Sequence, residues 1–107
     1  MAERVARLLK GCKCITQRQM FGGVYFLLNG HMCCGVERRR LMVRVGPGQY
    51  KAALGKRHAR PMDFPGRPLN GFVFVMPEGL RSRAALKGWV DLGVRYAASL
   101  PPKPGSA

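Results

Sequence analysis

Acidic side chains are scarce in this sequence. Its 107 residues include 5 Asp and Glu against 19 Lys and Arg, which gives a formal net charge of +14 at pH 7. So few carboxylates leave few candidates for acid–base catalysis. The excess of positive charge favours a polyanionic partner, such as nucleic acid, acidic lipid or an acidic protein surface. A bias toward Arg, Ala, Gly and Pro is also typical of GC-rich coding, so the charge alone does not choose a partner.

Long hydrophobic runs are missing as well. No apolar run approaches the ~20 residues of a membrane span, and residues 1–10 are charged rather than the apolar block of a signal peptide. We therefore expect a cytoplasmic protein that does not contact the membrane. The length and the 47% of hydrophobic residues predict a single domain over residues 1–100. The Pro-rich residues 101–107 are expected to form a flexible tail.

The four cysteines show no C-x-x-C spacing. Without a secretion signal, we expect Cys12, Cys14, Cys33 and Cys34 to be reduced. Cys33 and Cys34 are adjacent in a predicted strand, where neighbouring side chains point to opposite faces, so they should not share one metal ion. We predict that they pack as small hydrophobic residues, and that the protein holds no metal and no cofactor.

A β-hairpin is the clearest local signal. Asn29-Gly30 favours a type I′ turn between VYFLL and HMCCGV. The expected register pairs Leu28 with His31, Leu27 with Met32, Phe26 with Cys33 and Tyr25 with Cys34. A second hairpin through residues 37–40 pairs Val36 with Leu41 and Cys34 with Val43. Alternation then predicts an apolar core face of Tyr25, Leu27, Met32, Cys34, Val36, Leu41, Val43 and Val45, and a mixed face of Val24, Phe26, Leu28, His31, Cys33, Met42 and Arg44.

Helical patterns flank these strands. The remaining expected elements are a helix from about Val5 to Gly11, an edge strand over 14–20, a short helix from Pro47 to Gly55, brief strand structure at 62–64, a strand over 71–77 and a final helix capped by Ser82. The final helix carries an apolar face of Leu86, Trp89, Val90, Gly93, Ala97 and Leu100. Its glycines, Gly88 and Gly93, predict close packing against the sheet. The predicted fold class is α+β, with two layers: an antiparallel β-sheet meander packed against N- and C-terminal helices.

Catalytic arrangements are weak. Asp63 lies near His58 in sequence, and Cys33 lies near His31, but neither pair has a third orienting group or a phosphate-binding loop beside it. We therefore predict that the protein is not an enzyme and has no catalytic residues.

Four stretches together resemble a known family. RQMFGGVYFLLNGHMCCGV, LMVRVGP, HARPMDF and GFVFVMPEGL are similar to the N-terminal domain of the competence regulator TfoX, also called Sxy, and of its stand-alone bacterial relatives. The resemblance implies a two-layer α+β fold and a bacterial cytoplasmic protein. It also implies regulation of transcription, since TfoX promotes transcription of competence genes together with the cyclic-AMP receptor protein. TfoX has a second, C-terminal domain that we do not expect in this chain.

Two functional hypotheses follow. The first is a non-catalytic regulatory or protein-interaction module, whose partner by family analogy is the transcription machinery. Its candidate surface consists of Met20, Phe21, Gly22, Gly23, Arg60, Pro61 and Met62. These residues also have a structural interpretation, in which the glycines permit a bend and the methionines fill the core.

The second hypothesis is non-specific nucleic-acid binding through basic loops. The candidate phosphate contacts are Arg38, Arg39, Arg40, Arg57 and Arg67. No helix-turn-helix, zinc finger or RNP-type aromatic pattern accompanies them, so we do not expect sequence-specific readout.

Overall fold

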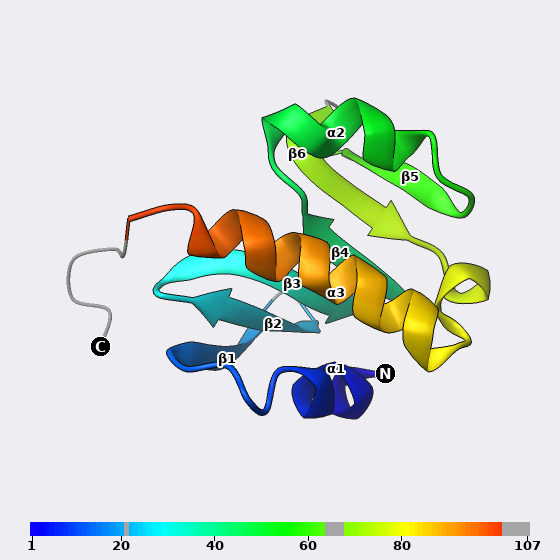
Figure 1. Ribbon diagram of the computed structural model, residues 1–107. Coiled ribbons are helices and arrows are strands. Elements are labelled where there is room, and N and C mark those ends of the chain that lie inside the picture. Colours follow the sequence, from blue (N-terminus) through cyan, green and yellow to red (C-terminus); the bar gives the residue numbers. More distant parts are fainter. Residues whose placement is uncertain (21, 64–67, 102–107) are drawn as a thin grey trace.

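The protein is described by a computed structural model of residues 1–20, 22–63 and 68–101 (Figure 1). Its elements in chain order are α1 (Ala2–Leu8), β1 (Ile15–Met20), β2 (Gly23–Leu28), β3 (His31–Glu37), β4 (Arg40–Arg44), α2 (Pro47–Leu54), β5 (Ala59–Asp63), β6 (Pro68–Val75), the 3-10 helix η1 (Pro77–Leu80) and α3 (Arg83–Ala98).

The strands of the described residues form one antiparallel sheet in the order β1-β2-β3-β4-β6-β5. The first four strands follow the chain as a meander, and β5 forms the far edge beyond β6. Helix α3 lies across β3 and β4, while α2 packs over β5 and β6 (Figure 1). The predicted α+β class, with helices packed on an antiparallel sheet, is confirmed.

The β2–β3 hairpin follows the prediction at its turn and departs from it farther away. Asn29 and Gly30 have φ angles of 53° and 83°, as a type I′ turn requires. Leu28 pairs with His31 and Leu27 with Met32, as predicted, but Phe26 then pairs with Cys34 and Tyr25 with Gly35. A β-bulge therefore inserts one additional residue into β3, and the two predicted pairs beyond it are wrong.

The bulge changes which side chains share a face. The predicted core residues Cys34, Val36, Leu41, Val43 and Val45 do lie in the main core beneath the helices, together with Phe26, Leu28 and Cys33. The predicted core residues Tyr25, Leu27 and Met32 instead pack on the other face, with Met42 and Phe74. The single predicted core face is therefore wrong, because an odd insertion reverses the alternation on one side of it.

Cys33 and Cys34 show the same effect most directly. Both side chains are fully buried in the main core, so the prediction that they point to opposite faces is wrong, while the predicted burial of Cys34 is confirmed. In a bulge, two consecutive residues oppose one partner residue, here Phe26, and strict alternation is lost.

Helix α3 supplies most of the helical packing. Its predicted residues Leu86, Trp89, Val90, Gly93 and Ala97 are buried, and the Ser82 hydroxyl accepts a 3.0 Å hydrogen bond from the Ala85 N–H, as a helix cap should. A Cβ on Gly93 would collide with the backbone carbonyl of Cys33, which confirms close packing there. Gly88 has no such neighbour within 4 Å, so the same expectation is wrong for Gly88.

The other predicted elements are present with altered ends. The first helix ends at Leu8 rather than near Gly11, and the edge strand and the short helix after Pro47 lie where they are expected. Strand β5 begins three residues before the predicted one, and β6 is longer than predicted at its start. Among the described residues, no helix has the length and apolar character needed to cross a membrane. Residues 102–107 of the predicted tail lie outside the described residues.

Candidate interaction surface

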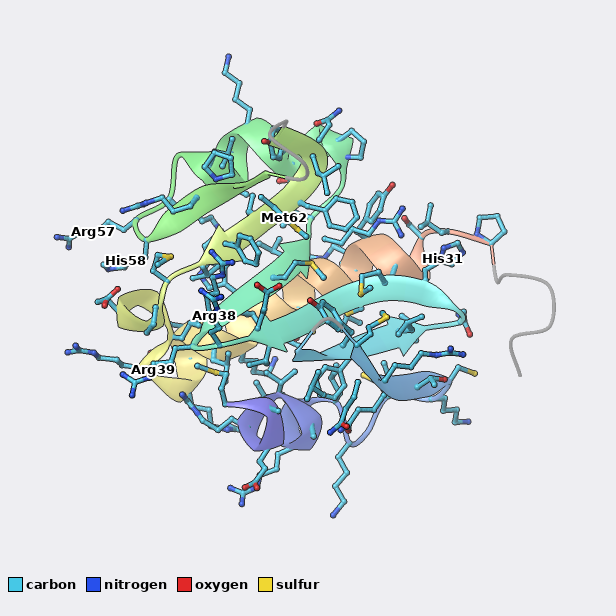
Figure 2. All side chains as sticks on the ribbon, turned by 180° about the vertical axis from the view of Figure 1, so that it is seen from behind. His31, Arg38, Arg39, Arg57, His58 and Met62 are labelled. Atoms are coloured by element: carbon cyan, nitrogen blue, oxygen red, sulfur yellow. The ribbon has the colours of Figure 1, made fainter. Side chains whose placement is uncertain are left out.

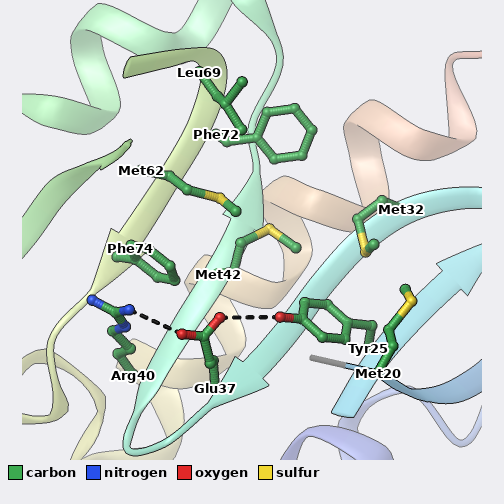
Figure 3. Close-up of a pocket in the computed structure, with 10 residues that line it drawn as sticks. All are labelled: Met20, Tyr25, Met32, Glu37, Arg40, Met42, Met62, Leu69, Phe72 and Phe74. Carbon is green, nitrogen blue, oxygen red and sulfur yellow. Dashed lines mark hydrogen bonds and ion pairs between the residues drawn. The ribbon is translucent and has the colours of Figure 1, made fainter. Parts of the chain in front are cut away.

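The sheet face turned away from α3 is hollowed by a groove of about 430 Å³ (Figure 3). We call it the methionine groove, and it is lined by Met20, Tyr25, Met32, Glu37, Arg40, Met42, Met62, Leu69, Phe72 and Phe74. Four of the six methionines of the chain are in this lining. Met20 and Met62 come from the two opposite edge strands, β1 and β5, so the curled sheet directs both of its edges toward one hollow (Figure 3).

The floor of the methionine groove is a small second core. Tyr25, Met42 and Phe74 are only 5%, 1% and 7% exposed, although the described helices pack on the other face of the sheet. The partly buried side chains packed around them are Met20, Leu27, Met32, Met62 and Phe72. Because methionine is flexible and polarizable, a surface rich in it adapts to apolar side chains of different shape.

A polar network forms one end of the groove. The Arg40 guanidinium donates a 3.0 Å hydrogen bond to Glu37 Oε1, and the Tyr25 hydroxyl donates a 3.1 Å bond to Glu37 Oε2 (Figure 3). The same guanidinium lies 3.8 Å from the centre of the Phe74 ring. Both oxygens of Glu37 thus have partners within the protein, and Arg40 is fixed over the aromatic floor by an ion pair and a cation–π contact.

The network shifts the pKa values of both acids in it. The hydrogen bond from Arg40, supported by the bond from Tyr25, holds the pKa of Glu37 below its usual range. Burial, followed by the neighbouring Glu37 carboxylate, raises the pKa of Tyr25 above its ordinary value. At neutral pH, Glu37 is therefore charged and Tyr25 is a neutral hydrogen-bond donor.

The predicted interaction residues are only partly brought together. Met20 and Met62 line the groove, and Arg60 pairs with Phe74 on its floor. Gly22 has φ 76° in the β1–β2 turn, and Gly23, at the start of β2, approaches the Val36 carbonyl of β3 so closely that a Cβ would lie 2.7 Å from it, so both glycines have a structural role. Pro61 is exposed on β5, opposite Val73, and Phe21 lies outside the described residues.

Sequence reasoning missed most of the groove. Unbroken alternation places Tyr25 and Met32 in the main core, on the face opposite to Met42, and it does not single out Glu37 or Phe74. The available signal was the presence of a methionine in four of the six strands, which is unusual for a surface.

The predicted phosphate contacts separate into two groups. Arg38 and Arg39 form the β3–β4 turn, and Arg57 lies in the α2–β5 loop at the same end of the molecule (Figure 2). We call Arg38, Arg39 and Arg57 the basic end. The Met76 N–H donates a 2.8 Å bond to the His58 carbonyl, which ties the α2–β5 loop to the end of β6 beside this turn. Arg40 points instead into the methionine groove, and Arg67 lies outside the described residues.

Of the two pairs with catalytic residue types, the structure describes the side chains of only one, Cys33 and His31, and it does not bring them together. Cys33 is buried in the main core, whereas the His31 Nε2 is 2.6 Å from the carbonyl oxygen of Pro101. His58 packs against Gly79, and the side chain of Asp63 lies outside the described residues. Within the described parts of the chain, no three His, Cys, Asp or Glu side chains gather as a metal site would require.

Comparison with known proteins bears on the family. The family model described as the TfoX N-terminal domain matches residues 7–97. No match was found among curated proteins or among solved structures. Because the family match spans most of the 107 residues and agrees with the motifs in β1–β6, the chain belongs to the TfoX N-terminal domain family.

Proposed function

We propose that this domain is a non-catalytic protein-interaction module, and that the methionine groove is its docking surface. The observation that carries the proposal is an apolar hollow of about 430 Å³ on the sheet face that the described helices leave open, lined by four methionines from four strands. Contiguous apolar surface of this kind on a small protein marks interaction sites, and methionine suits partners of varied shape.

The regulatory part of the proposal rests on the family. TfoX regulates transcription, and a docking domain without catalytic groups is suited to act by bringing proteins together. The transcription machinery is therefore the class of partner that we propose by family analogy.

Methionine methyl groups give a direct test. Protein labelled with ¹³C at the methionine methyls is titrated with an uncharged amphipathic peptide of Leu, Phe, Ser and Gln. We expect the signals of Met20, Met32 and Met62 to shift, while Met1, which lies outside the groove in α1's N-terminal region, serves as the internal control. Absence of shifts, or equal shifts of all the signals, would contradict docking in the groove.

Non-specific nucleic-acid binding is the second candidate function. The specific observation in its favour is that Arg57, which is distant in sequence from the adjacent Arg38 and Arg39, lies at the same end of the molecule as they do (Figure 2). Phosphate contacts need only positive charge at suitable spacing, so this basic end is sufficient for weak binding that does not depend on sequence.

A further inference from the structure

We propose that the segment that occupies the methionine groove is acidic: its apolar side chains sit in the groove and its carboxylates lie over the arginines around it. This inference rests on the proposed function and adds the chemistry of the partner. It is carried by the charges that the strand register places on the open face.

The register puts arginines around the apolar floor. Directly paired residues of antiparallel strands project from the same face. The pairs on the open face include Arg18 with Tyr25, Arg40 with Glu37 and Arg60 with Phe74. Arg44 pairs with Phe72, but its guanidinium also lies 5.3 Å from the centre of the Tyr96 ring of α3. Arg18, on β1, and Arg60, near the start of β5, are exposed, so their charges are available to a ligand.

The carboxylate of the described groove lining is already paired. Glu37 is the carboxylate that the described groove lining contains, and it accepts hydrogen bonds from both Arg40 and Tyr25. A partner therefore meets a face with a net excess of positive charge. Positive charges on a partner would be repelled, while carboxylates would be attracted, and this difference gives specificity and faster association.

A second hollow adjoins the groove at the basic end. Arg40 lines the methionine groove and, with Arg38, Arg39, Met76 and Pro77, a second hollow of about 300 Å³. A segment that leaves the groove past Arg40 therefore passes directly over the β3–β4 turn. This arrangement favours a ligand that carries acidic residues beside its apolar ones.

The same observations disfavour two other occupants. A second copy of this chain would bring two faces rich in arginine together on molecules of net charge +14. Single-stranded nucleic acid on a sheet needs exposed aromatic faces for base stacking. Tyr25 and Phe74 are 5% and 7% exposed, and Arg40 already covers the Phe74 ring. The Phe72 ring is partly buried, and the Arg44 guanidinium lies 5.4 Å from its centre.

Three matched fluorescent peptides test the inference by anisotropy. The first alternates Leu or Phe with Glu, the second has Gln in place of Glu, and the third has Ser in place of the apolar residues. We expect the first to bind at least about tenfold more tightly than either of the others, because each lacks one half of the complementarity. Its binding should shift the methyl signals of Met20, Met32 and Met62.

Two double variants with the same change of charge locate the binding. Arg18→Ser with Arg60→Ser removes exposed charge from the open face, and we expect it to weaken the binding of the acidic peptide about tenfold. Arg7→Ser with Arg83→Ser removes exposed charge from the helices, and it should change the affinity less than about twofold. Equal losses in the two double variants would overturn the inference, because the attraction would then be a general effect of net charge.

The remaining outcomes separate the inference from the proposed function. If the Gln peptide binds as tightly as the Glu peptide, the groove docks apolar segments and the acidic partner is wrong. If the Ser peptide binds as tightly, or if no peptide moves the methionine signals, docking in the groove is wrong as well. If oligo-uridine RNA displaces the acidic peptide and shifts the same methyl signals, the occupant is a nucleic acid and the inference is overturned.

Discussion

At the scale of single residues, Glu37 joins Arg40 and Tyr25 into one polar network on the open face. Arg40 and Tyr25 both donate to its carboxylate, and the side chains of Arg40 and Glu37 are 33% and 24% exposed. Because the pair is partly open to water, we expect Glu37→Gln to lower the free energy of unfolding by only about 1 kcal/mol at neutral pH.

The pH dependence follows from the direction of the Glu37 shift. Its pKa is lower in the folded protein than the unfolded value of about 4.3, so its contribution to stability is complete above that value and is lost as the pH falls through the folded pKa. Thermal unfolding should therefore show a steeper acid loss of stability for the wild type than for Glu37→Gln. If the two proteins lost stability equally as the pH is lowered, the network would be contradicted.

Tyr25 gives the matching alkaline test within the same network. Burial and Glu37 raise its pKa in the folded protein, so its contribution is complete below the unfolded value of about 10 and is lost as the pH rises through the folded pKa. Tyr25→Phe should reduce the loss of stability at high pH, whereas Glu37→Gln should mainly change the loss of stability at low pH. Both are measured in the same series of melting curves.

The cysteines divide sharply by exposure. Cys33 and Cys34 are fully buried, Cys12 is partly buried and Cys14 is exposed. A hydrogen bond with the Cys33 sulfur, together with burial, raises the pKa of the Cys34 thiol, which further lowers its thiolate fraction. We expect iodoacetamide to modify Cys14 first, and to reach Cys33 and Cys34 only after denaturation. Mass spectrometry of timed samples would show this order, and early modification of Cys34 would contradict its burial.

At the scale of elements, the two glycines of α3 make a matched pair. A Cβ on Gly93 would meet the Cys33 carbonyl, which is backbone and does not yield easily, whereas Gly88 is open to solvent. Gly93→Ala should therefore destabilise the protein by about 1–3 kcal/mol through overpacking. Gly88→Ala should stabilise it by roughly 1 kcal/mol, because alanine has the better helix propensity.

Chemical denaturation of both variants distinguishes packing from propensity. If Gly93→Ala were neutral, α3 would not approach β3 as closely as the structure has it. If Gly88→Ala were as damaging as Gly93→Ala, the exposed side of the helix would be assigned wrongly.

The strands show how far local patterns could predict the elements. The Asn29-Gly30 turn, the second hairpin and the apolar side of α3 were all predicted, because each depends on residues close together in sequence. The bulge at Cys33 was not, because its position depends on how β3 pairs along its whole length, although Gly35 beside it is a residue type that often accompanies a bulge.

At the scale of the whole molecule, this one insertion decided how well the site could be predicted. The fold class and the family followed from the motifs and the order of elements. The candidate surface did not, since Tyr25 and Met32 join the face of Met42 only when a single residue is added to β3. Met20 and Met62 of the predicted surface do line the groove, because they come from the two edge strands that border it.

The distribution of charge leads to the last prediction, which concerns nucleic acid. With a net charge of +14 and with Arg38, Arg39 and Arg57 at one end, we expect weak binding to duplex DNA that does not depend on sequence. Such binding releases counterions, so its affinity should fall steeply as salt is raised. Arg38→Ser with Arg39→Ser should weaken the affinity for DNA of every sequence equally. It should also lower the slope of log affinity against log salt concentration by about 2, near one unit for each phosphate that is no longer neutralised. Arg40 is left unchanged, because its guanidinium is held by Glu37 and Phe74.

Controls separate this charge effect from the groove. Met62→Ser alters the apolar lining without changing the charge. It should leave the affinity for DNA unchanged and weaken the binding of the acidic peptide. Anisotropy with two unrelated duplexes at several salt concentrations measures both slope and specificity. Strong preference for one duplex, or binding that persists at high salt, would mean that the basic end reads a defined site. Absence of binding even at low salt would mean that the excess charge does not serve nucleic acid, and would leave the acidic protein partner as the reason for arginines around an apolar groove.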